Sequence, residues 1–321
     1  MAALMGGMGA PHRPVLLRET IELLRPEHGG LFVDGTLGLG GHSEAILEAS
    51  LDARVIGIDR DREALRWATE RLARYGTRFQ AVHANFRDIA QVVREAGEAV
   101  LSGVLVDLGV SSLQFDDAER GFSFRHDAPL DMRMDAESDE ETAADLLARL
   151  PEEELARIIF EYGEERRSRR IARWIVERRE RGEPIKGTRE LAELVARAYG
   201  SRRSEHIHPA TRTFQALRIA VNGELAGLGE FVETAIDLLQ EDGRFVAISF
   251  HSLEDRIIKR NLRRLAGHCE CDRRVPVCSC GARRAVEILT RRPLQPDQLE
   301  IDENPRARSA KLRAARKLGA S

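Results

Sequence analysis

Short apolar runs alternate with segments of helical periodicity along the first third of the chain. Four runs predict strands: Leu31–Val33, Val55–Ile58, Phe79–Val82 and Val104–Val106. Between them, the spacing of apolar residues predicts a helix from about Gly41 to Ala49 and another through DREALRWATERLARYG, with Gly76 as the residue after its end. Strands separated by helices predict an α/β fold with a mostly parallel, doubly wound sheet, whose ligand crevice lies at the C-terminal ends of the strands.

The alternation stops between about Arg125 and His208, where the segments are helical and highly charged. It resumes with a helix through TRTFQALRIAVNGEL, the strand RFVAISF, a helix from near Leu253, and the strands RAVEILT and SAKLRAARK. We therefore predict one α/β domain, residues 11–124 and 209–321, interrupted by a helical subdomain at residues 125–208. Residues 1–10 are predicted to form a disordered tail.

Charge is distributed unevenly along the 321 residues, although the net charge is only −3. From Arg256 to the end there are 17 Lys and Arg against 7 Asp and Glu, whereas Asp135–Glu165 holds 12 acidic residues and 2 arginines. A basic terminal segment on an acidic body indicates a localised anionic partner such as RNA, although solvated charged faces would produce the same pattern. No stretch approaches the roughly 18 apolar residues of a membrane span, and MAALMGGMGA lacks the features of a secretion signal, so we expect a cytoplasmic protein.

All four cysteines lie within twelve residues, in the pattern C-x-C-x6-C-x-C: Cys269, Cys271, Cys278 and Cys280. Cysteines packed this closely are candidates for a structural zinc site. The spacing is tighter than the common C-x2-C pairs, so reduced thiols without metal remain the alternative.

A glycine-rich loop, DGTLGLGGHSEA, joins the first predicted strand to its helix. It matches the dinucleotide-binding pattern G-x-G-x-x-G imperfectly, because Ser43 stands where the third glycine belongs. Asp59 lies 19 residues after Gly40, which suits a carboxylate that binds ribose hydroxyls in either a nicotinamide cofactor or S-adenosylmethionine. Asp34 suits a ligand that carries an ammonium and a sulfonium and would repel a diphosphate, although it could simply cap the loop. The pattern favours the methyl donor.

The other predicted strands also end in polar or aromatic residues. Asn85 and Phe86 follow the third strand and are candidates to frame an adenine, and Asp107 ends the fourth. A carboxylate directly after an apolar strand is costly to bury unpaired, so we expect Asp107 to face the crevice. The loop after it carries Ser111, Ser112 and Gln114.

Eight blocks of sequence carry a specific resemblance to a known family: HRPVLLRE, DGTLGLGGHS, GIDRDREAL, DLGVSSLQFDDAERGFSFRHDAPLDMRM, YGEER, HPATRTFQALRIAVNGEL, ISFHSLEDRIIKR and ENPRARSAKLRAA. In this order they resemble the bacterial 16S rRNA cytosine-N4 methyltransferases, from His12 to Ala315. The resemblance implies a class I S-adenosylmethionine-dependent methyltransferase, Rossmann-like, with an inserted helical subdomain. The implied substrate is the N4 amine of a decoding-centre cytidine, the 1402 position, of 16S rRNA in the assembled or nearly assembled 30S subunit.

The resemblance also implies which residues contact the methyl donor: Gly40, Gly41, His42, Asp59, Phe86, Asp107 and Gln114. We expect Asp34 to contact the donor as well. One departure is Leu113, where proline is common in the family.

For the reaction, we hypothesise that Asp107 orients the donor while Ser111, Ser112 or backbone carbonyls meet the target amine. His251 is the alternative proton acceptor, and a structural histidine in a turn is an equally good interpretation of it.

Arg306 and Arg308 are candidates for RNA phosphate contacts, whereas Arg212 and Arg218 are candidates for a structural role. Two other functions stay open at this point: a nicotinamide-dependent oxidoreductase, and a non-catalytic zinc-ribbon protein that binds RNA.

Overall fold

The computed structural model describes residues 14–110, 114–115, 117–200, 208–269, 271 and 280–319. The chain divides into two compact units, of which the first comprises Met1–Gly109 and Gly227–Ser321 and the second Val110–Ala226. Within the described ranges, no helix has the length and apolar character needed to cross a membrane.

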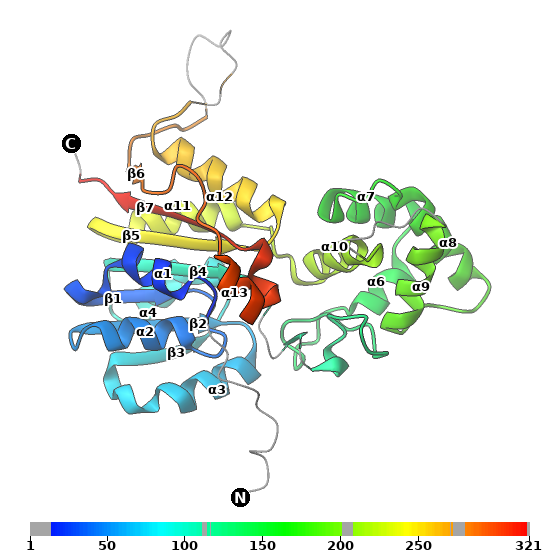
Figure 1. Cartoon of the computed structure of the whole chain (residues 1–321), viewed down its shortest axis with the longest axis horizontal. Coiled ribbons are helices and arrows are strands. Elements are labelled where there is room, and N and C mark those ends of the chain that lie inside the picture. The colour runs from blue at the N-terminus through cyan, green and yellow to red at the C-terminus, as the bar shows by residue number, and fades with distance from the viewer. Residues whose placement is uncertain are drawn as a thin grey trace, which may run out of the picture. The chain divides into compact units, whose positions relative to one another are not determined.

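The first unit is built on a seven-stranded sheet in the order β3-β2-β1-β4-β5-β7-β6 (Figure 1). The neighbouring strands from β3 to β5 pair in parallel, and β7 pairs antiparallel with both β5 and β6. The strands span β1 Gly30–Asp34, β2 Ala53–Asp59, β3 Phe79–His83, β4 Leu101–Leu108, β5 Leu239–Ser249, β6 Val286–Ile288 and β7 Lys311–Lys317. Every strand predicted from the sequence is present, and the predicted α/β fold is confirmed.

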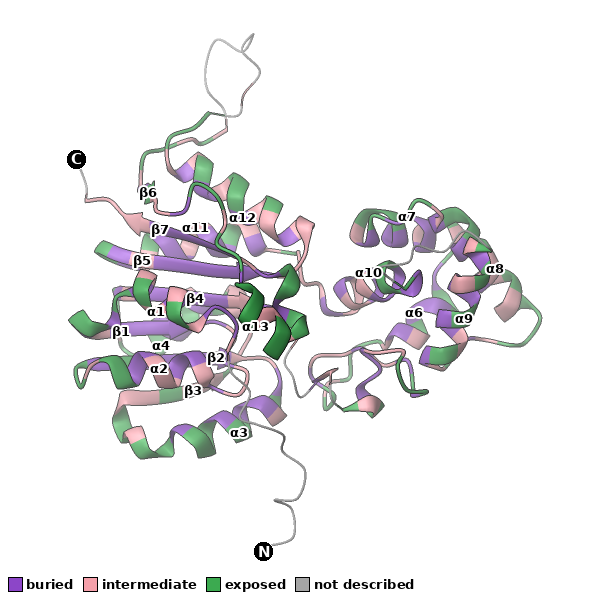
Figure 2. Cartoon of the chain, viewed as in Figure 1, coloured by how far each residue is buried: buried purple, intermediate pink, exposed green. Residues whose placement is uncertain are grey.

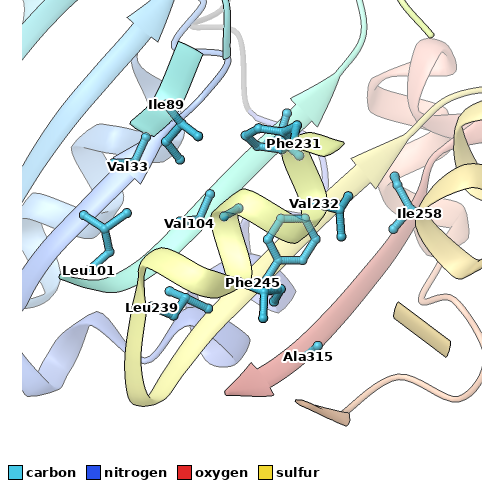
Figure 3. Packing of buried hydrophobic residues seen from close by; sticks show 14 of the residues in the cluster. Val33, Ile89, Leu101, Val104, Phe231, Val232, Leu239, Phe245, Ile258 and Ala315 are labelled. Atoms are coloured by element: carbon cyan, nitrogen blue, oxygen red, sulfur yellow. The ribbon is translucent and has the colours of Figure 1, made fainter. Parts of the chain in front are cut away.

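Helices cover both faces of this sheet because successive strand residues point to opposite sides. Val33 of β1 packs with α4, α11 and α12 in one apolar cluster, part of which is drawn in Figure 3. Phe32, its neighbour, packs with α1, α2 and α3 in another. These helices span α1 Leu17–Leu24, α2 Gly41–Ala49, α3 Arg62–Leu72, α4 Ile89–Glu95, α11 Leu228–Leu238 and α12 Ser252–Leu265, and the short α13 covers Gln298–Glu303.

The end of α3 differs from the prediction. The helix ends at Leu72, and the chain continues as a 3-10 segment, η2, over Ala73–Arg78. Gly76 is therefore not the residue that terminates α3. It takes a positive φ of 56° inside this segment, where the chain turns towards β3, and a turn of this kind attracts glycine for the same steric reason as a helix end.

The second unit is helical, with five helices in its described part: α6 Ala143–Arg149, α7 Glu152–Gly163, α8 Ser168–Glu180, α9 Thr188–Tyr199 and α10 Ala210–Asn222. Their buried faces form one apolar cluster, which also takes in Phe122 and Leu130 (Figure 2). The predicted insertion, residues 125–208, lies within this unit. The α10 segment, which the sequence pattern assigned to the α/β domain, packs on α7 and α9 through Phe214 and Leu217.

The order of the strands determines where a ligand can bind. From β1, the chain crosses to β2 and β3 on one side of the sheet and later returns to place β4 on the other side. Asp34 at the end of β1 pairs in register with Leu105 of β4. This change of direction opens a crevice outside the C-terminal ends of β1 and β4, which is where open α/β sheets bind their ligands.

Candidate functional site

The glycine-rich loop between β1 and α2 is shaped by close approaches that exclude side chains. Gly40 has a φ of 76° and precedes the first residue of α2, and a Cβ on it would lie 2.9 Å from Leu72 Cδ1. A Cβ on Gly41 would lie 2.4 Å from Pro14 Cγ. Gly40 has no side chain and therefore does not cap α2. A helix N-terminus carries the positive end of the helix dipole, which favours an anionic group.

Asp34 braces the loop from inside. Its Oδ1 accepts a hydrogen bond from the Thr36 N–H (3.2 Å) and its Oδ2 accepts one from the Ser43 hydroxyl (2.8 Å). The side chain is buried, and this desolvation raises its pKa to about 6. The structure thus supports the loop-capping interpretation of Asp34, and direct contact with a donor stays a prediction.

Asp59 occupies the matching position at the end of β2. Its Oδ2 accepts a hydrogen bond from the Gly38 N–H (2.7 Å) and its Oδ1 accepts one from the Asp61 N–H (2.8 Å). Desolvation again raises the pKa, here to about 6. The Arg60 N–H also donates to this carboxylate. Two carboxylate oxygens have about four acceptor sites, so a ribose hydroxyl can still be accepted.

Asp107 differs from the other two carboxylates because no residue in the described part of the chain donates to one of its oxygens. Its backbone N–H donates to Thr36 Oγ1 (2.6 Å), which ties the end of β4 to the glycine-rich loop. The Oδ1 atom is enclosed and has no hydrogen-bond partner among the described residues, although the side chain as a whole is 23% exposed. Desolvation, assisted by the nearby charges of Asp34 and Glu254, raises the pKa to about 8. A perturbed, unpartnered carboxylate in a crevice is a functional-site candidate.

Phe86 follows β3 in the 3-10 segment η3, Phe86–Asp88. Its ring meets the Phe231 ring edge-on, with 4.8 Å between the ring centroids. The Phe86 Cβ lies against Gly35, because a Cβ added to that glycine would be 3.2 Å from it. The neighbouring Asn85 caps η3 by accepting a hydrogen bond from the Arg87 N–H (3.1 Å). Phe86 is thus held at the strand edge in the position predicted for an adenine contact, and Asn85 has a local structural role.

His42 is fixed in place by the segment before α1. Its Nε2 lies 3.1 Å from the Val15 carbonyl oxygen, which only accepts, so Nε2 carries the proton. Its Nδ1 lies 3.9 Å from Asp107 Oδ2. With the ring buried and engaged in this way, we expect His42 to contact a ligand through its backbone N–H.

His251 has a clear structural role at the start of α12. It is the N-cap residue, and its Nδ1 accepts a hydrogen bond from the Glu254 N–H (3.4 Å), while Nε2 lies 3.0 Å from Glu254 Oε1. The Glu254 carboxylate in turn accepts from the Phe250 N–H (2.9 Å). Because the cap occupies the Nδ1 lone pair, the geometry favours the structural interpretation of His251, and its role as proton acceptor stays untested.

The other predicted residues have different outcomes. Gln114 belongs to the second unit, where its amide donates to the Met134 carbonyl (3.3 Å). Arg218 forms a largely buried ion pair with Glu224 (2.8 Å), as expected for a structural arginine. Arg306 and Arg308 are exposed in the 3-10 segment η5, Pro305–Ser309. Ser111, Ser112 and Cys278 lie outside the described residues.

Three contributors to the site were not predicted from the sequence. Ser43 stands where the dinucleotide pattern has a glycine, yet its hydroxyl donates to Asp34, and the Thr36 hydroxyl accepts from the Asp107 N–H. Glu254 adds a fourth carboxylate, and the only signal for it was the helix-start spacing His251-x-x-Glu254. None of the described Lys and Arg residues forms an ion pair with Asp34, Asp59 or Asp107, so this edge of the sheet has an excess of negative charge that suits a cationic ligand.

Comparison with known proteins shows the family. A family model described as the MraW methylase family matches residues 9–318. The chain belongs to the MraW methylase family. A protein of Carboxydothermus hydrogenoformans named Ribosomal RNA small subunit methyltransferase H is 52% identical over 307 residues, which cover 96% of this chain and 98% of that protein. The protein of the same name from Geobacter sulfurreducens is 55% identical over 309 residues, with 96% and 99% coverage. The family predicted from the sequence blocks is confirmed.

In this MraW-family protein, the charge of Asp107 must reduce the stability of the ligand-free state. A folded pKa of about 8, above the ordinary 3.8, means that the unfolded chain loses this proton first as the pH rises. The contribution of Asp107 to stability is therefore most favourable below about pH 4 and is lost between about pH 4 and 8, by at most about 1.4 kcal/mol per pH unit.

We predict that Asp107→Asn raises the Tm of the ligand-free protein at pH 8.5, and that the gain shrinks towards pH 5. Differential scanning calorimetry across this range measures it. Asp34→Asn is the matched control, because its amide would face the Thr36 N–H or the Ser43 hydroxyl, and we expect it to lower the Tm at pH 8.5. An Asp107→Asn protein no more stable than wild type at pH 8.5 would contradict this electrostatic account.

Proposed function

We propose that this protein transfers the methyl group of S-adenosylmethionine to the N4 amine of cytidine 1402 in 16S rRNA. The observation that carries the proposal is the enclosed Oδ1 of Asp107, which lies near two other carboxylates, those of Asp34 and Glu254. No described Lys or Arg pairs with Asp107 at this point, where the sheet changes direction between β1 and β4. S-adenosylmethionine brings an ammonium and a sulfonium to such a site. Membership of the MraW methylase family, and relatives named for small-subunit ribosomal RNA, support the same conclusion.

The site also suits the rest of the donor. The first-turn N–H groups of Gly41 and His42 would hold its carboxylate at the positive end of the α2 dipole. Asp107 would accept a hydrogen bond from the ammonium of the donor, and Asp59 would accept hydrogen bonds from its ribose hydroxyls. Phe86 would lie against its adenine. The negative and positive groups of S-adenosylmethionine would therefore each meet a group of opposite charge or polarity in this site.

The nicotinamide alternative fits these charges poorly. It would bring a diphosphate to a loop bordered by Asp34, Asp59 and Asp107, where like charges repel. The non-catalytic RNA-binding alternative gives no role to the unpartnered Asp107. Calorimetric titration with S-adenosylmethionine and with NAD separates the three, since only the methyltransferase binds the methyl donor.

Chemically, the reaction is a displacement in which the cytosine nitrogen forms a bond to the methyl carbon as the carbon–sulfur bond breaks. The sulfur keeps the electron pair, and the nitrogen then loses a proton. The amine is a weak nucleophile because its lone pair is delocalised into the ring, so positioning contributes most, up to roughly 7–11 kcal/mol for well-oriented reactants. Ser111 and Ser112 remain the candidates to hydrogen-bond to the target amine. His251 is the second candidate for proton acceptor, because its Nδ1 is occupied in capping α12.

RNA would be held by the basic segment that begins at Arg256. Four cationic residues recur at helical spacing on the exposed face of α12: Arg256, Lys259, Arg260 and Arg263 (Figure 2). Arg306 and Arg308 add two exposed charges on η5, although the preceding α13 is acidic. These residues are suited to contact phosphates, while the target cytidine must be unpaired to reach the donor.

We predict that the protein methylates one cytidine, at N4 of position 1402, and does so faster on 30S subunits than on bare 16S rRNA. Reconstituted subunits and bare rRNA from cells that lack this modification are incubated with labelled donor, and mass spectrometry of nuclease fragments locates the methyl group. A product methylated at carbon 5, or on another nucleotide, would contradict the proposed specificity. Faster methylation of bare rRNA would contradict only the choice of the 30S subunit as substrate.

RNA binding is expected to depend steeply on salt concentration, on the cationic face of α12 and on the two arginines of η5. Deleting the chain after Asn304 is a poor test because it removes β7, which pairs with both β5 and β6. We predict instead that Lys259→Gln/Arg263→Gln and Arg306→Gln/Arg308→Gln each weaken 30S binding and reduce the salt slope, by about one for each phosphate that the variant no longer neutralises.

Arg18→Gln/Arg54→Gln is the matched control, since these exposed arginines pair with Glu19 and Glu98. Equal salt slopes in this control and in both test variants would rule out the proposed RNA-contacting residues.

A further inference from the structure

Three cysteine side chains converge in the segment that links α12 to β6. The Sγ atoms of Cys269, Cys271 and Cys280 all lie within 4.8 Å of one another, and those of Cys269 and Cys280 are 3.7 Å apart. Cys280 is eleven residues from Cys269, so its approach is a feature of the fold and not of local sequence alone. We propose that these three thiolates bind a zinc ion.

The distances suit zinc. A tetrahedral zinc–sulfur site has bonds of about 2.3 Å, which places neighbouring sulfurs about 3.8 Å apart. The separation of Cys269 and Cys280 matches this edge, and it is far longer than the roughly 2.05 Å of a disulfide bond. Small movements of the Cys271 side chain complete a face of the tetrahedron, which leaves one position for a fourth ligand.

The backbone around Cys269 favours its ionised form. The N–H of Cys271 points at the Cys269 Sγ, 3.4 Å away. An N–H donor to sulfur stabilises negative charge there, and bonds of this kind orient the ligands of metal sites.

The stems of the segment are held together independently of the cysteines. Ala266 and Arg284 form an antiparallel bridge, the Ala285 N–H donates to the Leu265 carbonyl (2.7 Å), and the Arg283 N–H donates to the Arg264 carbonyl (3.1 Å). The first two cysteines therefore approach the third from opposite stems of a closed loop. A metal ion would cross-link the loop, whose sequence offers few apolar residues for a core of its own.

The site is separate from the donor crevice. The 14 residues of α12 carry the chain about 21 Å away from the end of β5, where His251 and Asp107 lie. The zinc would therefore be structural, fixing the loop that extends the basic α12. Its loss is expected to leave donor binding intact, which distinguishes a failure of this proposal from a failure of the proposed function.

The test is the metal content of the full chain purified without chelators. We expect about one zinc per chain by mass spectrometry, and at least a fivefold loss in Cys269→Ser and in Cys280→Ser. Arg284→Gln, an exposed change on the same stem, is the matched control and should keep its zinc. Replacement by Co²⁺ should give the thiolate charge-transfer bands of a tetrahedral site.

Calorimetry with S-adenosylmethionine shows whether each cysteine variant is still folded, and we expect unchanged donor affinity. Less than about 0.2 zinc per wild-type chain, with all cysteines reactive towards a thiol reagent, would overturn the proposal. Zinc retained in both cysteine variants, or a disulfide between Cys269 and Cys280 in protein kept reduced, would overturn it as well.

Discussion

The enclosed carboxylate of Asp107 is the constraint around which the functional half of this protein is arranged. Burying an acceptor without a donor costs free energy, and Asp34 and Glu254 add repulsion to that cost. Folding places this charge at the switch point because β1 and β4 are neighbours there and Thr36 holds the Asp107 N–H. Near neutral pH the free protein avoids this charge by keeping Asp107 protonated, and a ligand that arrives with positive charge would favour loss of the proton.

The same arrangement offers different binding groups to the carboxylate and to the ammonium of an amino acid. In the proposed function, the first turn of α2 would hold the carboxylate of the donor and Asp107 would accept a hydrogen bond from its ammonium, so the methionine moiety would have a defined direction. The proposed RNA contacts include the exposed basic face of α12.

Much of this could be predicted from the sequence because strand ends carry the chemistry of an α/β fold. Asp34, Asp59, Phe86 and Asp107 each follow an apolar run, and each lies at the predicted edge. Which acid is braced and which is unpartnered could not be predicted, because this depends on the folded conformation of the glycine-rich loop, in which the Ser43 hydroxyl reaches Asp34 while no described donor reaches Asp107 Oδ1. The packing of α10 likewise depends on tertiary contacts that its sequence does not reveal.

Proton release on donor binding tests the central claim most directly. Isothermal titration of S-adenosylmethionine at pH 7, in buffers of different ionisation enthalpy, measures how many protons leave as the donor binds. Because Asp107 holds its proton up to about pH 8 in the free protein, we predict the release of up to about one proton, and its loss in Asp107→Asn. Equal proton release in the two proteins would contradict the account.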